Sequence, residues 1–237
     1  MIFQGLASSS DGNAYLVDDG ESRILLECGI PFSRLQKALG FRVSGLCACL
    51  VTHEHGDHSK GCGELLRRGV RVYASAGTCE ALGNACLEPL PGQKGAYQPF
   101  QTGTFRVLPF ETFHGDVAEP VGYLVQSLTD GDKLVFAIDT VSIPHRFPGM
   151  NILAVECNHA IEKLERNTRL PASKVRRIAN THMEVNRLCD WLKGQDLSRC
   201  REIHLLHLSN ANSNEGLFVD LVERCVPRHV RVTACGK

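Results

Sequence analysis

The chain has 237 residues, of which 43% are apolar, and its 26 basic and 26 acidic side chains give a formal net charge of zero. This composition is typical of a globular protein with a sizeable core, and no apolar run is long enough to span a bilayer. Proteins that grip long duplex nucleic acid usually have a basic surface, so the neutral charge favours a small or short substrate or a local basic patch.

The first part of the chain reads as short strands that are separated by turn residues, followed by alternating helices and strands. Pro31 stands where a proline is tolerated, in the first turn of a helix. The predicted elements are strands at 2–7, 14–17 and 23–27, a helix from Pro31 to about Leu39, a strand at 46–52, a helix near 60–68, a strand at 71–75 and a helix at 76–86.

The rest of the chain is rich in strands at first and then alternates between strands and helices. Two β-rich halves that each collect helices fit an α/β fold, a four-layer αββα sandwich. No repeat, linker or low-complexity tract is present, so we expect a single domain over residues 1–237. The predicted strands are 104–109, 121–127, 133–139, 152–156, 202–208 and 229–234, and the predicted helices are 172–179, 184–193 and 214–224.

Eleven cysteines are scattered along the chain. Their odd number and the lack of a basic-then-apolar leader predict reduced thiols and a cytoplasmic location. No Cys-x-x-Cys pair occurs, so a zinc knuckle is not expected. Cys47 and Cys49 fall in an apolar strand and are expected to fill the core.

Three histidines and an aspartate are concentrated in the segment Thr52–His58, directly after an apolar run. Imidazole and carboxylate groups are the usual protein ligands of zinc and similar divalent metals. A strand that ends in a tight loop can aim alternate side chains at one point. We therefore expect His53 and His55 to face one ion, and Asp57 and His58 to face a second.

This His-x-His-x-Asp-His pattern resembles the signature of the metallo-β-lactamase superfamily, and His114, Asp139 and His207 match the remaining ligand positions of that family. The resemblance implies two divalent ions per chain, zinc as the first choice and manganese or iron as alternatives. The first ion takes His53, His55 and His114, the second takes Asp57, His58 and His207, and Asp139 bridges the two.

The likeness extends to one branch of the superfamily. Residues 6–14 resemble the start of the YycJ (WalJ) type of hydrolase, which is related to ribonuclease Z and to small phosphodiesterases, and residues 119–123, 156–159 and 207–212 agree with it. Glu27 replaces the aspartate that this type usually has. We expect Glu27 to brace the metal loop through hydrogen bonds.

The chemistry of a two-metal site is suited to phosphodiester hydrolysis. Two ions about 3.5–4 Å apart can share a hydroxide as nucleophile at neutral pH, and Asp57 is expected to orient it. Protonation of the leaving alkoxide needs a general acid of near-neutral pKa, which a histidine provides. His182 is the candidate, because ribonuclease Z has a histidine at the matching place, and its partner glutamate corresponds to Glu156. A carboxylate beside an imidazole favours the charged form.

These residues predict a metal-dependent phosphodiester hydrolase, foremost a nuclease that trims the ends of single-stranded DNA or RNA. Lys174, Arg176 and Arg177 form a candidate basic patch near His182, and His159 is a weaker candidate for a phosphate contact. The alternatives are hydrolysis of a small cyclic or nucleotide phosphodiester and, less favoured, of a thioester. A non-enzymatic protein is disfavoured because all seven ligand positions are filled. No membrane partner is expected, and the oligomeric state stays open.

Overall fold

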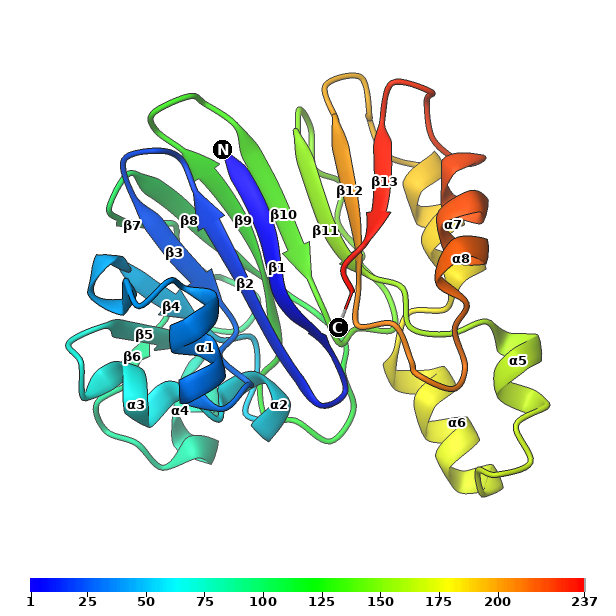
Figure 1. Cartoon of the computed structure of the whole chain (residues 1–237), viewed down its shortest axis with the longest axis horizontal. Helices are drawn as coiled ribbons and strands as arrows, with labels where there is room; N and C mark the ends of the chain where they lie inside the picture. The colour runs from blue at the N-terminus through cyan, green and yellow to red at the C-terminus, as the bar shows by residue number, and fades with distance from the viewer. Residues whose placement is uncertain (237) are drawn as a thin grey trace. The chain divides into compact units, whose positions relative to one another are not determined.

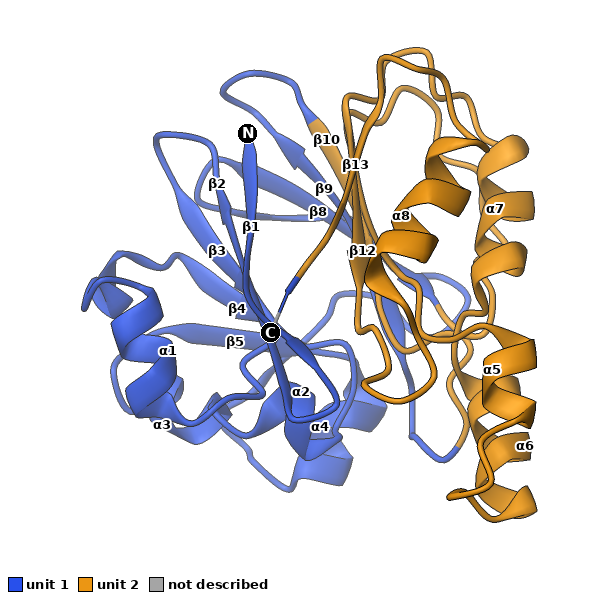
Figure 2. Cartoon of the chain, turned by 45° about the vertical axis from the view of Figure 1, so that its right-hand side comes forward, with its two compact units in different colours: residues 1–111, 116–132, 236–237 blue, residues 112–115, 133–235 orange. Residues whose placement is uncertain are grey.

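The computed structural model describes residues 1–236 and contains two β-sheets together with helices (Figure 1). The chain divides into two compact units (Figure 2). Unit 1 contains residues 1–111 and 116–132, and unit 2 contains residues 112–115 and 133–235. The predicted single domain over residues 1–237 stays a prediction.

Unit 1 holds a six-stranded sheet whose strands follow one another in sequence order. The first three strands are antiparallel and the others continue the sheet in parallel. The sheet consists of β1 (Ile2–Ser9), β2 (Gly12–Asp18), β3 (Arg23–Leu26), β4 (Ala48–Leu50), β5 (Arg71–Ala74) and β6 (Glu88–Pro89). An antiparallel meander of β7 (Phe100–Thr102), β8 (Phe105–Glu111) and β9 (Val121–Ser127) completes the strands of the unit.

The core of unit 1 lies between this sheet and its helices. Strand β3 is apolar at every position after Arg23 and fully buried there, as expected of a strand that is covered on both faces. Leu25, Cys49 and Val72 of the sheet pack in one cluster with Leu35 and Leu65 of the helices. The helical segments are α1 (Phe32–Ala38), a 3₁₀ turn (Val43–Gly45), α2 (Gly56–Ser59), α3 (Cys62–Leu66) and α4 (Ala76–Leu82).

Unit 2 is built on four parallel strands, β10 (Lys133–Ala137), β11 (Ile152–Glu156), β12 (Glu202–Leu206) and β13 (Arg231–Ala234). The full strand order of the second sheet is β13-β12-β11-β10-β9-β8-β7. Helices α7 (Val185–Lys193) and α8 (Glu215–Glu223) pack on each other, and α8 packs on β13 (Figure 1). Helices α5 (Ile161–Glu165) and α6 (Ala172–Thr181) form a second pair. None of the helices that residues 1–236 form has the length and apolar character needed to cross a membrane.

Most predicted elements are present, but their ends differ. The predicted helix near 60–68 is the shorter α3, which a break at Gly61 separates from α2. A Cβ atom at Gly61 would lie 2.7 Å from the carbonyl oxygen of Cys28, and the Gly61 amide donates a hydrogen bond to that oxygen at 2.8 Å. This close approach of two backbones explains the break. Helices α2 and α5 and strands β6 and β7 were not predicted, because each is too short to show a periodic pattern.

Asp19, in the turn after β2, holds three parts of unit 1 together. Its Oδ1 accepts hydrogen bonds from the amides of Glu21 and Ser22, and its Oδ2 accepts hydrogen bonds from the hydroxyls of Thr104 at 2.6 Å and Ser127 at 3.0 Å. Burial raises the pKa of Asp19, but these hydrogen bonds outweigh it and lower the pKa to about 2. The carboxylate therefore stabilises the fold above its unfolded pKa, and this contribution is lost as pH falls toward 2.

We predict that Asp19→Asn lowers the free energy of unfolding at pH 7 by roughly 1–2 kcal/mol, a value that allows for the partial exposure of the side chain. The variant should also lose less stability than the wild type between pH 4 and pH 2. Urea unfolding at several pH values measures both effects. Glu21→Gln is the matched control, since Glu21 is exposed and should be neutral. Parallel stability curves for Asp19→Asn and the wild type in acid would contradict the prediction.

Candidate metal centre

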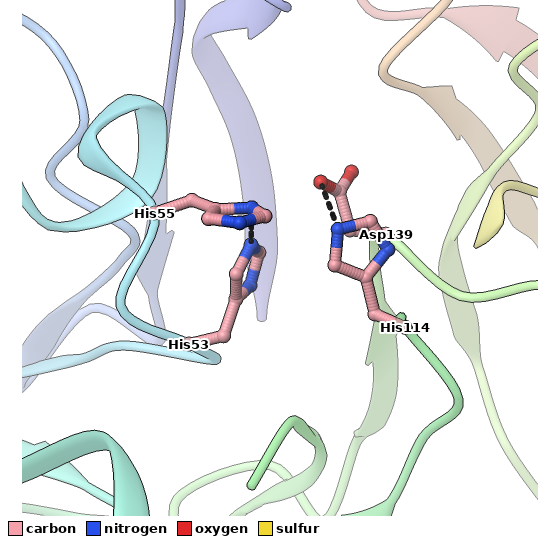
Figure 3. Close-up of side chains that lie close together, drawn as sticks. All are labelled: His53, His55, His114 and Asp139. Atoms are coloured by element: carbon pink, nitrogen blue, oxygen red, sulfur yellow. Dashed lines mark hydrogen bonds and ion pairs between the residues drawn. The ribbon is translucent and has the colours of Figure 1, made fainter. Parts of the chain in front are cut away.

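Four predicted metal ligands gather at the end of β4 in unit 1. His53 Nε2 lies 3.1 Å from His55 Nδ1 (Figure 3). His55 is the residue before α2, so Asp57 and His58 fall in the first turn of that helix, where Asp57 Oδ2 lies 3.4 Å from His58 Nε2. The rings of His53 and His58 have centroids 4.1 Å apart. The loop thus brings together the donor atoms that its sequence predicted.

Glu27 braces the loop of residues 52–58 through a hydrogen bond, as predicted. It is fully buried, its Oε1 accepts a hydrogen bond from the Thr52 amide at 3.2 Å, and its Oε2 lies 3.4 Å from His58 Nδ1. Burial raises the pKa of Glu27, while His58 and Thr52 act to lower it. Asn13 adds a second brace, because its side-chain amide donates to the carbonyl oxygen of Asp57 at 3.3 Å. His58 is therefore oriented by groups outside the motif.

Two predicted ligands of unit 2, Asp139 and His207, and the predicted partner of His182, Glu156, lie at the carboxyl ends of neighbouring parallel strands. Asp139 follows β10, Glu156 ends β11 and His207 follows β12. His207 Nδ1 lies 2.8 Å from Asp139 Oδ1 and 3.1 Å from Glu156 Oε1. His114 Nε2 lies 3.7 Å from Asp139 Oδ2 (Figure 3). His207 is buried beside the two carboxylates, and although burial lowers its pKa, they raise it to about 10.

Asp139 and His207 have backbone φ angles of 47° and 52°, in the left-handed region that residues other than glycine seldom adopt. Such strain persists only where the surroundings fix it, and it is common at functional sites. The Asn158 side chain donates to the carbonyl oxygen of His207 at 2.9 Å. This bond helps to hold His207 in its turn.

His114 is oriented by the backbone of a distant segment. Its Nδ1 lies 3.0 Å from the carbonyl oxygen of Thr181, at the end of α6. A carbonyl oxygen only accepts hydrogen bonds, so Nδ1 carries the proton and the lone pair is on Nε2, the atom nearer Asp139. This is the arrangement by which proteins usually prepare a histidine to bind a metal. Neither Thr181 nor Asn158 was predicted, because a brace through the backbone leaves no mark in the sequence.

Glu156 and His182 form a buried pair. His182 Nδ1 lies 2.7 Å from Glu156 Oε1, and Oε2 of the same carboxylate accepts hydrogen bonds from the amides of Thr140 at 2.8 Å and Met183 at 3.1 Å. Burial raises the pKa of Glu156, but His182 outweighs it, so the net shift is downward. Burial lowers the pKa of His182, but Glu156 outweighs it, so the net shift is upward.

These donor groups suit a divalent cation. Two nitrogens that each lie about 2 Å from a tetrahedral zinc are about 3.3 Å apart, close to the 3.1 Å between His53 Nε2 and His55 Nδ1. In unit 2, Asp139, Glu156, His182 and His207 each offer a donor atom within 4.8 Å of the others. Both clusters combine imidazole and carboxylate groups, as zinc, manganese and iron sites do.

Two of the weaker predictions have different outcomes. His159 is fully buried and burial lowers its pKa to about 4, so contact with a phosphate in solution is not supported. Its position is explained by a bridge to Glu184, which anchors the segment after His182. Lys174, Arg176 and Arg177 are all exposed on α6, as a basic patch requires.

Residues 22–205 match the family model of the β-lactamase superfamily domain. The chain is 31% identical over 230 residues to exodeoxyribonuclease YycJ of Bacillus anthracis, a match that covers 91% of this chain and 85% of that protein. It is 27% identical over 221 residues to exodeoxyribonuclease WalJ of Streptococcus pneumoniae serotype 2, with 88% and 81% covered.

The crystal structure of the metallo-β-lactamase fold protein YhfI from Bacillus subtilis matches with a TM-score of 0.72 at 16% identity, and the match covers 98% of this chain and 94% of that one. At this identity the likeness shows the fold alone. The predicted α/β metallo-β-lactamase fold is therefore confirmed, and so is the resemblance from which it followed. The chain belongs to the metallo-β-lactamase superfamily and is related within it to the exodeoxyribonucleases YycJ and WalJ.

Proposed function

We propose that this protein is a metal-dependent phosphodiester hydrolase that works as a nuclease on the ends of single-stranded DNA or RNA. The relatives named as exodeoxyribonucleases support this activity across nearly the whole chain. The observation that carries the proposal is the Glu156–His182 pair at 2.7 Å, in a cluster with Asp139 and His207. Metal ligands alone do not require such a pair, whereas expulsion of an alkoxide requires a proton donor.

The seven predicted ligands would hold two divalent cations, zinc as first choice. One cation would take His53, His55 and His114, the other would take Asp57, His58 and His207, and Asp139 would be shared. This assignment follows the ligand pattern of the superfamily together with the donor geometry within each unit. When bound, the cations supply Lewis acidity at the phosphate and activate the attacking water.

The chain's own residues would orient the reactants and move the proton. Asp57 is placed in the first turn of α2, where its carboxylate can accept a hydrogen bond from the attacking water. His182 uses Nδ1 to bind Glu156, so Nε2 is the atom that would donate a proton to the leaving oxygen. Two backbone amides donate to the other oxygen of Glu156, so Glu156 and His182 would keep their positions while His182 donates its proton.

The zero net charge favours one alternative, a small cyclic or nucleotide phosphodiester as substrate. Metal-reconstituted protein should be incubated with 5′-labelled and 3′-labelled single-stranded DNA and RNA, with a cyclic dinucleotide, and with bis(p-nitrophenyl) phosphate. Product ladders from oligonucleotides support the nuclease. Turnover of the cyclic substrate with intact oligonucleotides would replace the nuclease by a small-molecule phosphodiesterase.

We predict that His58→Ala and Asp139→Asn each lose bound metal and abolish hydrolysis while the fold persists. Each removes a donor, and Asp139 would be a donor to both cations. Elemental analysis of purified protein measures the metal, and circular dichroism checks the fold. His229→Ala is the control, since His229 is exposed and should keep the wild-type metal content. Wild-type protein from metal-replete medium that holds no transition metal would refute the assignment.

We predict that His182→Ala slows natural diesters by roughly 10²–10⁴ and p-nitrophenyl esters far less, because p-nitrophenolate leaves without a proton. Glu156→Gln should act in the same direction but more weakly. Since Glu156 raises the pKa of His182, the pH above which natural-diester turnover declines should move lower in Glu156→Gln. His145→Ala, at an exposed position, is the control. Equal losses on both ester classes would reassign His182 to substrate binding or structure.

A further inference from the structure

Phe113 presents an exposed aromatic ring directly before a candidate metal ligand. Its side chain is 48% exposed, although the backbone on both sides of the ring is fixed. The Phe113 amide donates to the Thr140 hydroxyl at 3.0 Å, and its carbonyl oxygen accepts from the Val141 amide at 3.0 Å. Single exposed apolar residues are common on protein surfaces. A ring that is held in place beside a candidate metal ligand is suited to a specific role, because an unpaired base can stack on it.

A basic surface lies on the same unit. Residues 161–181, which form α5, α6 and their connection, are called the basic hairpin. The hairpin has six basic and two acidic side chains, a net charge of +4 in a chain whose total is zero. All six basic side chains are exposed, and Leu164 is its one fully buried apolar side chain. The six are Lys163, Arg166, Arg169, Lys174, Arg176 and Arg177.

Four of the six cations of the basic hairpin lack a carboxylate partner within the part of the chain that the structure describes. Within residues 1–236, Arg166, Arg169, Lys174 and Arg176 form no ion pair. Other exposed arginines are paired: in unit 1, Arg68 pairs with Glu64 and Arg71 pairs with Glu88. A cluster of like charges without carboxylate partners leaves a local positive field, and phosphate groups are the anions that such a field would attract.

The Phe113 loop and the basic hairpin meet at Thr181. The Thr181 carbonyl oxygen accepts from His114 Nδ1 at 3.0 Å, and the Thr181 hydroxyl donates to the carbonyl oxygen of Arg177 at 2.8 Å. A Cβ atom on Gly115 would lie 3.0 Å from the Thr181 methyl group, so the two segments are packed closely. Aromatic ring, candidate ligand and last turn of α6 are thus one connected structure within unit 2.

We propose that Phe113 and the basic hairpin form a binding track for single-stranded nucleic acid. One unpaired base stacks on the Phe113 ring, and the phosphates of neighbouring nucleotides lie along Arg176, Arg177 and the other cations of the hairpin. Proteins that bind single strands without sequence preference combine these two elements. A base within a duplex has both faces covered, so the track selects single-stranded ends. The inference rests on the proposed function and names its substrate class.

The stacking part is tested with Phe113→Ala on a labelled single-stranded oligonucleotide and on bis(p-nitrophenyl) phosphate. We expect KM for the oligonucleotide to rise about 5- to 100-fold and turnover of the small diester to stay unchanged. Phe113→Trp should restore KM, and Phe41→Ala, which removes a 67% exposed ring from unit 1, should have no effect. With the wild type, an oligonucleotide that has one abasic site should show the same rise in KM. With Phe113→Ala, the abasic site should cause no further rise in KM.

The electrostatic part is tested with the double variant Arg176→Glu and Arg177→Glu. Wild type should show a slope of log affinity against log salt of about −1 to −3, as expected for a few phosphates on a single strand, and the variant should show a smaller slope. Arg224→Glu with Arg228→Glu, exposed on the same unit but outside the hairpin, is the matched control. Circular dichroism verifies that each variant is folded.

The outcomes of these experiments distinguish failure of the proposed binding track from failure of the proposed nuclease activity. If wild type trims oligonucleotides while Phe113→Ala and the hairpin variant leave KM unchanged, the track is wrong and the nuclease stands. Equal losses on both substrates with Phe113→Ala would also refute the track, because the ring would then support the site itself. If wild type hydrolyses only a small phosphodiester, both proposals fail.

Discussion

Two buried carboxylates, Glu27 in unit 1 and Glu156 in unit 2, are the constraint on which the candidate residues of each unit depend. Each stands at the end of a strand, each is fully buried, and each binds a backbone amide together with a histidine of the candidate site. A buried carboxylate is costly unless hydrogen bonds and opposite charge compensate it. This requirement ties the strand ends to the loops that carry His58 and His182. His58 and His182 are therefore positioned by the need to compensate a carboxylate in the core.

At these strand ends, the strands predicted from the sequence were too long. Glu27, Asp139 and His207 were each predicted to lie within a strand, but all three have positive φ and stand just beyond it. Apolar runs indicate that a strand is present, whereas no propensity marks a charged residue in the left-handed region. Prediction of the strand ends failed at these strained positions, and two of them, Asp139 and His207, are predicted metal ligands. The strain is of order 1–3 kcal/mol per residue and needs the surrounding bonds to hold it.

The candidate site was predictable to the extent that ligands cluster along the chain. His53, His55, Asp57 and His58 follow from residue type and spacing, while His114 and His207 required a family resemblance because only the fold brings them near Asp139 or Glu156. Residue type can also suggest a site residue wrongly. His159 was a candidate for a phosphate contact, but its side chain is fully buried. Thr181 and Asn158 could not be predicted, because they act through hydrogen bonds that the tertiary structure creates.

Net charge is a poor guide to nucleic-acid binding when acidic and basic groups have different surroundings. Of this chain's carboxylates, Glu27, Asp139 and Glu156 are buried, and Glu64 and Glu88 are neutralised by arginines beside them. Carboxylates that are paired or buried contribute little field at the surface, and screening removes what remains beyond about 8 Å in physiological salt. Among the residues that the structure describes, Arg166, Arg169, Lys174 and Arg176 form no ion pair. A chain with zero total charge can therefore attract the phosphates of a short single strand at one place and still have no general affinity for long duplexes.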